Sequence, residues 1–247
     1  MRILIQRFAT VVVVLACAHV SSAQTADEIV EKSIAAMGGR AAMEKLKSRS
    51  MTGDISLTTP AGDIPGTVEI TNAAPNKSRT VIKADLSAFG AGPLVIDQRF
   101  DGATGYVLDS LQGNRDITGN QLDNMKSNSF PHAFLTYKAQ GTAVKLVGKS
   151  KVGERDAFEL MFEPSVGSSI RQFIDAENFL PVKTVIKANL PQVGDIEQTA
   201  IASDFREVDG VKVPYKIQVT SPATGFTMTF SKITNNVAVD EKSFMKP

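Results

Sequence analysis

The chain has 247 residues, with 27 basic and 26 acidic side chains and one cysteine, Cys17. The chain is nearly neutral and has no stripe of basic residues, which argues against a nucleic-acid-binding surface. One cysteine cannot form an internal disulfide, so the fold must depend on its apolar core, for which this length is sufficient.

The first 23 residues have the features of a secretory signal peptide. Arg2 and Arg7 form a basic region before an apolar run over residues 8–18, and small residues occupy positions 21–23. The run is too short to span a bilayer, which takes roughly 20 residues. We therefore expect cleavage near Ala23, export to the periplasm, and a single mature domain over residues 24–247. One alternative is a buried N-terminal helix. The other is a lipid anchor on Cys17, because residues 14–17 loosely resemble a lipobox.

The mature chain is predicted to begin with a helix over residues 25–39. Thr25 and Glu28 fit a capping box, and the glycines at 38 and 39 suit a helix end. A short second helix is expected over residues 40–46. An apolar stripe of the first helix, spaced for one helical face, is expected to cover a sheet; it consists of Val30, Ile34 and Met37. A face turned to lipid or to a partner is the alternative.

From residue 50 onward the apolar pattern changes to period 2, which is typical of antiparallel strands. Turn residues separate the runs, and the Asp101-Gly102 pair is a strong hairpin signal. The expected strands are 50–58, 66–72, 78–85, 94–101, 104–110, 157–163, 169–175, 181–188, 196–208, 211–220 and 225–233.

One insert interrupts this meander over residues 119–139. It lacks clean alternation and is predicted to form one or two helical turns, with Pro131 at the start of a turn. Its large apolar side chains are expected to cover the open side of a curved sheet, and they include Leu122, Met125 and Phe134. Together with the stripe of the first helix, these residues are the candidate lid.

The expected fold is mainly β (α+β): an unclosed barrel of about eleven antiparallel strands, with the N-terminal helix and the insert in its hollow. A closed lipocalin-like barrel is the competing architecture, but its eight longer strands do not fit so many short runs.

Few residues suggest catalysis. His132 is the only histidine after the signal peptide, no cysteine remains there, and the carboxylates are scattered singly. A nucleophile–base set or a metal site needs a cluster of such groups. We therefore expect no enzyme activity, no catalytic or metal-binding residue and no cofactor, with a structural or solvated role for His132.

Apolar side chains are the most informative feature. A curved sheet covered by few helices leaves space for an apolar ligand, unless its own side chains fill that space. Both outcomes remain open from the sequence. The candidate lining residues alternate along strands and are Phe158, Leu160, Phe162, Tyr215, Phe226, Met228 and Phe230.

Several segments resemble exported proteins of the outer-membrane lipoprotein carrier and receptor type (LolA/LolB-like). They are ADEIVEKSIAAMGG at 26–39, FDGATGYVLD at 100–109, LVGKSKVGERDAFELMF at 146–162, FIDAENFLPVK at 173–183, FREVDGVKVPYKI at 205–217 and VAVDEKSFMKP at 237–247. Tyr106 departs from this pattern, because many relatives have tryptophan there. No residue matches the carrier's functional arginine by motif, so the resemblance assigns no site residue.

The resemblance implies an unclosed barrel with helices in its mouth, and acyl chains held in the hollow of the best understood members. The function expected is a non-catalytic, monomeric periplasmic binder of a lipid, an acyl chain or a lipoprotein, such as a carrier. The alternative is an envelope sensing domain with a filled core that binds a membrane-associated protein partner.

Overall fold

The computed structural model describes residues 24–60, 62–190, 194–222 and 225–247. The expected signal peptide and Cys17 lie outside these residues.

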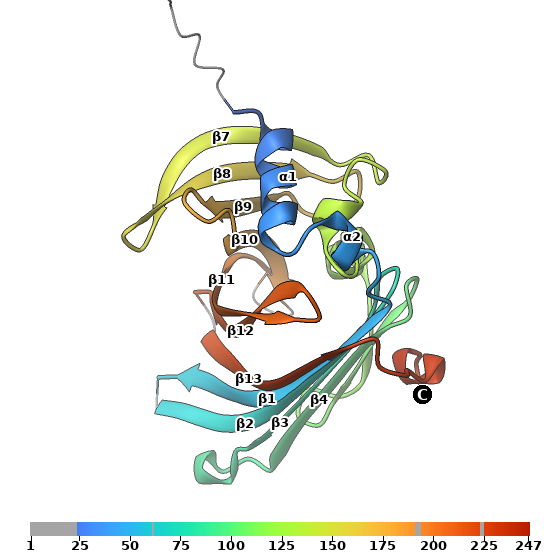
Figure 1. Cartoon of the computed structure of the whole chain (residues 1–247). Helices are drawn as coiled ribbons and strands as arrows, with labels where there is room; N and C mark the ends of the chain where they lie inside the picture. Colours follow the sequence, from blue (N-terminus) through green and yellow to red (C-terminus); the bar gives the residue numbers. More distant parts are fainter. Residues whose placement is uncertain (1–23, 61, 191–193, 223–224) are drawn as a thin grey trace, which may run out of the picture.

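Among the described residues, thirteen antiparallel strands form one continuous sheet (Figure 1). Their order is β6-β5-β4-β3-β2-β1-β13-β12-β11-β10-β9-β8-β7. The strands are β1 (Ser48–Thr59), β2 (Gly62–Ala73), β3 (Lys77–Asp85), β4 (Pro93–Phe100), β5 (Gly105–Asp109), β6 (Arg115–Ile117), β7 (Ala143–Val152), β8 (Arg155–Glu163), β9 (Ile170–Asp175), β10 (Pro181–Leu190), β11 (Gly194–Val208), β12 (Val211–Thr220) and β13 (Gly225–Asn235).

The sheet is unclosed, because β6 and β7 end it without pairing to each other in the described part of the chain. The expected fold class is therefore confirmed, with thirteen strands in place of about eleven. The two additional strands are these edges. β6 has only three residues. β7 is largely exposed, and an irregularity between Leu146 and Gly148 interrupts its register, so its sequence lacks clean alternation.

Helical segments lie within and around the curved sheet. They are α1 (Ala26–Ala36), α2 (Arg40–Met43), α3 (Gly119–Ser127) and the 3-10 turns η1 (Ser87–Phe89), η2 (Ala133–Leu135) and η3 (Glu241–Phe244). Figure 1 shows α1 crossing the β7–β9 side of the sheet. Its buried face packs in the main apolar core with side chains of β8 and β9, including Leu160 and Ile174.

Both ends of α1 follow the sequence prediction. The Thr25 side chain accepts a hydrogen bond from the Glu28 N–H, and Glu28 accepts one from the Thr25 N–H, which completes the capping box. At the other end, the Gly38 and Gly39 N–H groups donate to Ala35 and Ile34, as in a Schellman motif. The Lys212 N–H donates to the Met37 carbonyl at 2.8 Å, which fixes this helix end on the β11–β12 turn.

A bulge between β1 and β13 controls which side chains of β13 face the hollow. Gly53 pairs with Phe230 and Thr52 with Lys232, so Ser231 is an additional residue on β13. A β-carbon on Gly53 would lie 2.2 Å from the Thr229 carbonyl oxygen, so only glycine permits this close approach. Beyond the bulge, the paired Arg49 and Asn235 are both buried on the inner side of the sheet.

Candidate functional site

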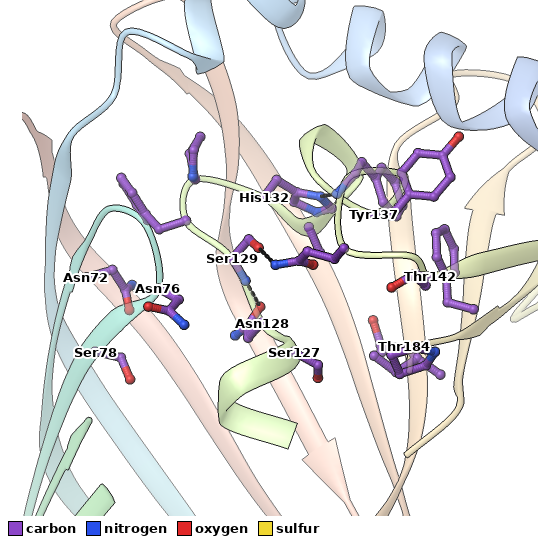
Figure 2. Close-up of a pocket in the computed structure, with 18 of the residues that line it drawn as sticks. Asn72, Asn76, Ser78, Ser127, Asn128, Ser129, His132, Tyr137, Thr142 and Thr184 are labelled. Atoms are coloured by element: carbon purple, nitrogen blue, oxygen red, sulfur yellow. Dashed lines mark hydrogen bonds between the residues drawn. The ribbon is translucent and has the colours of Figure 1, made fainter. Parts of the chain in front are cut away.

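A cavity of about 340 Å³ lies beneath the insert, between the β1–β3 side and the β8–β10 side of the sheet. Figure 2 shows Asn72, Asn76 and Ser78 on one side of it and Thr142 and Thr184 on the other. The remaining walls are a mixture of polar and apolar side chains. The apolar part of the cavity lining consists of Phe130, Pro131, Ala133, Phe134, Phe162, Pro164 and Ile170.

Individual hydrogen bonds tie the insert to both sides of the sheet. The Phe130 N–H donates to the Pro75 carbonyl in the β2–β3 turn at 2.7 Å. On the opposite side, the Ser168 N–H donates to Asn124 Oδ1 at 2.6 Å. The insert therefore bridges the mouth through local contacts and adds no strand to the sheet.

Polar contacts also join the insert to α1. The Tyr137 hydroxyl donates to Asp27 Oδ1 at 2.6 Å, and Lys138 Nζ lies 2.8 Å from Asp27 Oδ2. The hydrogen bonds from Lys138 and Tyr137 lower the pKa of the Asp27 carboxyl. Burial, together with the hydrogen bond to Asp27, raises the pKa of Tyr137 to about 12. At neutral pH Tyr137 is therefore a neutral donor to a charged carboxylate.

Aromatic rings form the apolar wall of the cavity. Phe134 and Phe162 stack with ring centroids 5.4 Å apart, and Tyr137 meets Phe162 edge-on at 5.9 Å. Offset or edge-on pairs of this kind stabilise beyond the area that they bury. Phe162 comes from β8 and Phe134 from the insert, so the contact seals one side of the cavity.

A second cavity of about 200 Å³ adjoins the first and extends towards α1, α2 and β12. Met37 and Met43 contribute to its lining. Residues that border both cavities mark their boundary; they are Arg49, Pro131, His132, Gln172 and Thr184.

Arg49 is a buried cation at this boundary, with 9% of its area exposed. Its Nε donates to Asn235 Oδ1 at 2.7 Å, and its Cζ lies 5.6 Å from the centre of the Phe130 ring. Its Nη2 is enclosed and has no hydrogen-bond acceptor. Burial lowers the pKa of Arg49 to about 10, against the opposing effect of the Asp209 charge, so the guanidinium stays protonated at neutral pH.

His132 is neutral at physiological pH. Its Nδ1 accepts a hydrogen bond from the Phe134 N–H at 3.2 Å, so His132 caps the η2 turn through an unprotonated Nδ1. Burial, followed by the charge of Arg49, lowers the pKa of His132 to about 4. His132 is partly buried and borders both cavities.

Gln172 and Thr184 hold each other in place beside Arg49. The Thr184 hydroxyl donates to Gln172 Oε1 at 2.9 Å, and Gln172 Nε2 donates to the Lys183 carbonyl at the same distance. The Gln172 and Thr184 side chains therefore already have hydrogen-bond partners. Among the five boundary residues, Arg49 is the one that carries a positive charge, and its Nη2 has no acceptor among the described residues.

The seven candidate lining residues belong to one apolar core or pack against it. Tyr215 and Phe226 are partly buried, whereas the other five are buried: Phe158, Leu160, Phe162, Met228 and Phe230. Phe162 borders the larger cavity. Side chains of α1 occupy much of the remaining hollow, so the free space lies towards the insert and the β1–β3 side.

The candidate lid residues divide into three groups. Val30 and Ile34 are buried in the core, and Met37 borders the smaller cavity. Phe134 borders the larger cavity. Leu122 and Met125 are partly exposed on α3, a helix with no buried residue.

Sequence reasoning missed Arg49 as a site residue. A signal was present, because period-2 alternation places Arg49 on the same face as Met51 and Ile55, which are apolar. A charged residue in line with core positions is unusual and indicates a partner or a function. The residue pattern does not reveal its partner, because Asn235 reaches the inner face of β13 only through the bulge.

No group of three or more His, Cys, Asp or Glu side chains in the described ranges is arranged to hold a metal ion. None of the helices in that part of the chain combines the length and apolar character needed to cross a membrane.

In comparisons by sequence, no protein-family model matches the chain and no curated protein is significantly similar. Several solved structures are similar. A LolA superfamily protein from Nitrosomonas europaea has a TM-score of 0.55 and 15% identity, covering 91% of this chain and 99% of that chain. A DUF1329 family protein from Desulfovibrio piger has a TM-score of 0.56 and 12% identity, and the match covers 89% of this chain and 97% of that chain.

A third similar structure is an outer membrane lipoprotein-sorting protein domain from Vibrio parahaemolyticus. Its TM-score is 0.55 at 12% identity, and the match covers 89% of this chain and 95% of that chain. At such low identities these likenesses concern the fold. The chain has the LolA-like fold, as its sequence segments indicated.

Proposed function

We propose that this protein is a non-catalytic binder of a lipid acyl chain, held in the cavity beneath the insert. The observation that carries the proposal is a cavity of about 340 Å³ that has one aromatic wall and lies under a segment attached by local contacts. Small-molecule sites usually have volumes of about 300–1,000 Å³ and combine apolar and aromatic side chains with polar groups that orient the ligand.

The energetics suit reversible binding. Removing a methylene from water contributes about 0.8 kcal/mol, so ten buried methylenes contribute about 8 kcal/mol. Loss of translational and rotational freedom on association offsets part of this gain. The resulting affinity is compatible with release to a partner, as a carrier of lipids or lipoproteins requires. The similarity of the fold to a lipoprotein-sorting domain supports this proposal.

Replacement of Phe134 with Asp is expected to weaken acyl-chain binding at least tenfold, because the carboxylate would lie against Phe162 in the apolar wall. Titration with a fluorescent fatty acid measures this change. Phe89→Asp is the matched control, since Phe89 lies in η1 and is largely exposed. Phe130→Ala provides a second, less buried variant, with the unfolding midpoint of each protein as the folding check. Equal binding by wild type and both cavity variants, or none by wild type, would contradict the proposal.

We also propose that the domain acts after export, with cleavage near Ala23 and no anchor on Cys17. The proposal rests on the order of basic, apolar and small residues in the first 23 positions. Intact-mass spectrometry of the protein from the periplasmic fraction is expected to give a chain that begins at Gln24. Retention of residues 1–23 would contradict export by this route, and a diacylated Cys17 would show an anchored form.

A further inference from the structure

Arg49 has donors that the fold does not use. Its Nε is bonded to Asn235, whose Nδ2 in turn donates to Asp209 Oδ2 and to the Val208 carbonyl, each at 3.2 Å. The described residues accept no hydrogen bond from either Nη atom, and Nη2 is enclosed. A buried charge without full hydrogen bonding is costly, so such groups are normally paired.

The residues around the two cavities favour an anion. Arg49 and Lys77 border the larger cavity, Arg49 and Lys212 border the smaller one, and no aspartate or glutamate is among the lining residues of either. Lys77 is already ion-paired with Glu241, and the Lys212 side chain is exposed. Of these three cations, Arg49 is the buried one, and it borders both cavities.

The contacts that Arg49 does make leave the end of the guanidinium unused. The Asn235 bond uses Nε, and the Phe130 ring faces the guanidinium carbon. The two Nη atoms remain, and their planar arrangement matches the two oxygens of a carboxylate. The aromatic wall of Phe130, Phe134 and Phe162 begins beside this group.

We propose that Arg49 anchors the head group of the ligand, and that the ligand is a single-chain amphiphile with a terminal carboxylate. Its carboxylate oxygens accept from Nη1 and Nη2, and its chain lies along Phe130, Phe134, Phe162 and Ile170. A cavity at the small end of the usual range for ligand sites suits one chain with a compact head. Because Nη2 is enclosed, full engagement requires a small displacement of the groups that cover it. This inference rests on the acyl-chain binding proposed above.

The test compares ligands that differ only in the head group. Displacement of the neutral dye N-phenyl-1-naphthylamine is measured with oleate, with oleyl alcohol and with inorganic phosphate. Wild-type protein is expected to bind oleate at least tenfold more tightly than the alcohol. Phosphate, which lacks a chain, is expected not to displace the dye; displacement by phosphate would overturn the assignment to a chain-bearing carboxylate.

Arg49→Met is expected to abolish the preference for oleate and to leave binding of the alcohol unchanged. Lys212→Met, which removes an exposed cation beside the smaller cavity, is the matched control and should keep the preference. Arg49→Lys keeps the charge but loses the planar pair of donors, so an intermediate preference is expected. Thermal unfolding checks each variant, because Arg49→Met leaves the buried Asn235 Oδ1 without its donor.

The outcomes separate this inference from the proposed function. If neither dye nor either oleyl ligand binds, acyl-chain binding itself is wrong. If both ligands bind equally to wild type, or if Arg49→Met keeps the preference, binding stands and the role of Arg49 is overturned. Should Arg49→Met fail to fold, the wild-type preference and its decrease in Arg49→Lys decide the question.

Discussion

Lowering the pH from 7 to 4.5 is expected to reduce the free energy of unfolding by about 2 kcal/mol through His132. Burial and the charge of Arg49 lower the pKa of His132 to about 4, whereas the unfolded chain has the ordinary value of 6.5. Between these two values the unfolded state binds more protons than the folded state. The stabilisation is complete above pH 6.5 and is lost as the pH falls towards 4.

Urea denaturation at half-unit intervals of pH measures this effect. His132→Asn is the matched variant, because its side-chain oxygen can replace Nδ1 as the acceptor of the Phe134 N–H. The variant is expected to show little change in stability between pH 6.5 and 4.5. A variant with the same slope as wild type would show that His132 titrates normally in the folded protein.

Buried aspartates do not obscure this window. Burial raises the pKa of Asp97, Asp101, Asp109 and Asp175, but their hydrogen bonds lower it further, so each ends below its usual value. Their stabilisation is present above the ordinary aspartate pKa of about 3.9 and is lost below it. The loss of stability between pH 6.5 and 5 can therefore be assigned to histidine, and the comparison with His132→Asn isolates its share below pH 5.

Gly38→Ala is expected to destabilise the protein by about 3 kcal/mol, from backbone strain together with overpacking. Gly38 has a φ of +122°, and a β-carbon there would lie 2.1 Å from the Gly210 carbonyl oxygen. That oxygen belongs to the β11–β12 turn on which the end of α1 rests. The substitution would therefore separate α1 from the sheet or distort the turn.

The neighbouring glycine supplies the control. Gly39 has a φ of +87°, but a β-carbon there would meet nothing within 4 Å. With a ψ of 155°, Gly39 lies in a region of backbone conformation that only glycine adopts readily, so Gly39→Ala should cost backbone strain alone, about 2 kcal/mol. Urea denaturation of both variants isolates the contact with Gly210 as the difference. Equal losses would show that α1 does not depend on this contact.

The sequence was most informative where local physics controls the structure. The capping box at Thr25 and Glu28 and the glycines at 38 and 39 defined α1, because caps depend on neighbouring residues alone. Strands with one buried face were recognisable from alternation. The edge strand β7 was not predicted separately, because it has little buried area to impose a pattern.

The candidate site was less predictable because it depends on contacts between distant segments. Alternation identified side chains of the inner face such as Phe158 and Leu160, but could not show that α1 packs over them. The space beneath the insert arises from where residues 119–139 contact the β2–β3 turn. Arg49 faces this space by the alternation of β1, whereas its partner Asn235, 186 residues later in the chain, reaches the inner face of β13 because of the bulge that Gly53 permits.

The open edges of the sheet have a consequence for the range of ligands. A closed barrel has a fixed circumference, set by its strand number and stagger, and widening it breaks a row of backbone hydrogen bonds. In this protein the mouth between the β1–β3 and β8–β10 sides is bridged by contacts of the insert, such as Phe130 with Pro75 and Ser168 with Asn124. Elastic bending of the sheet can therefore separate the two sides while the strand pairings stay intact. Ligand bulk is limited by the stiffness of this curved sheet, which permits chains of different girth to share one binding site.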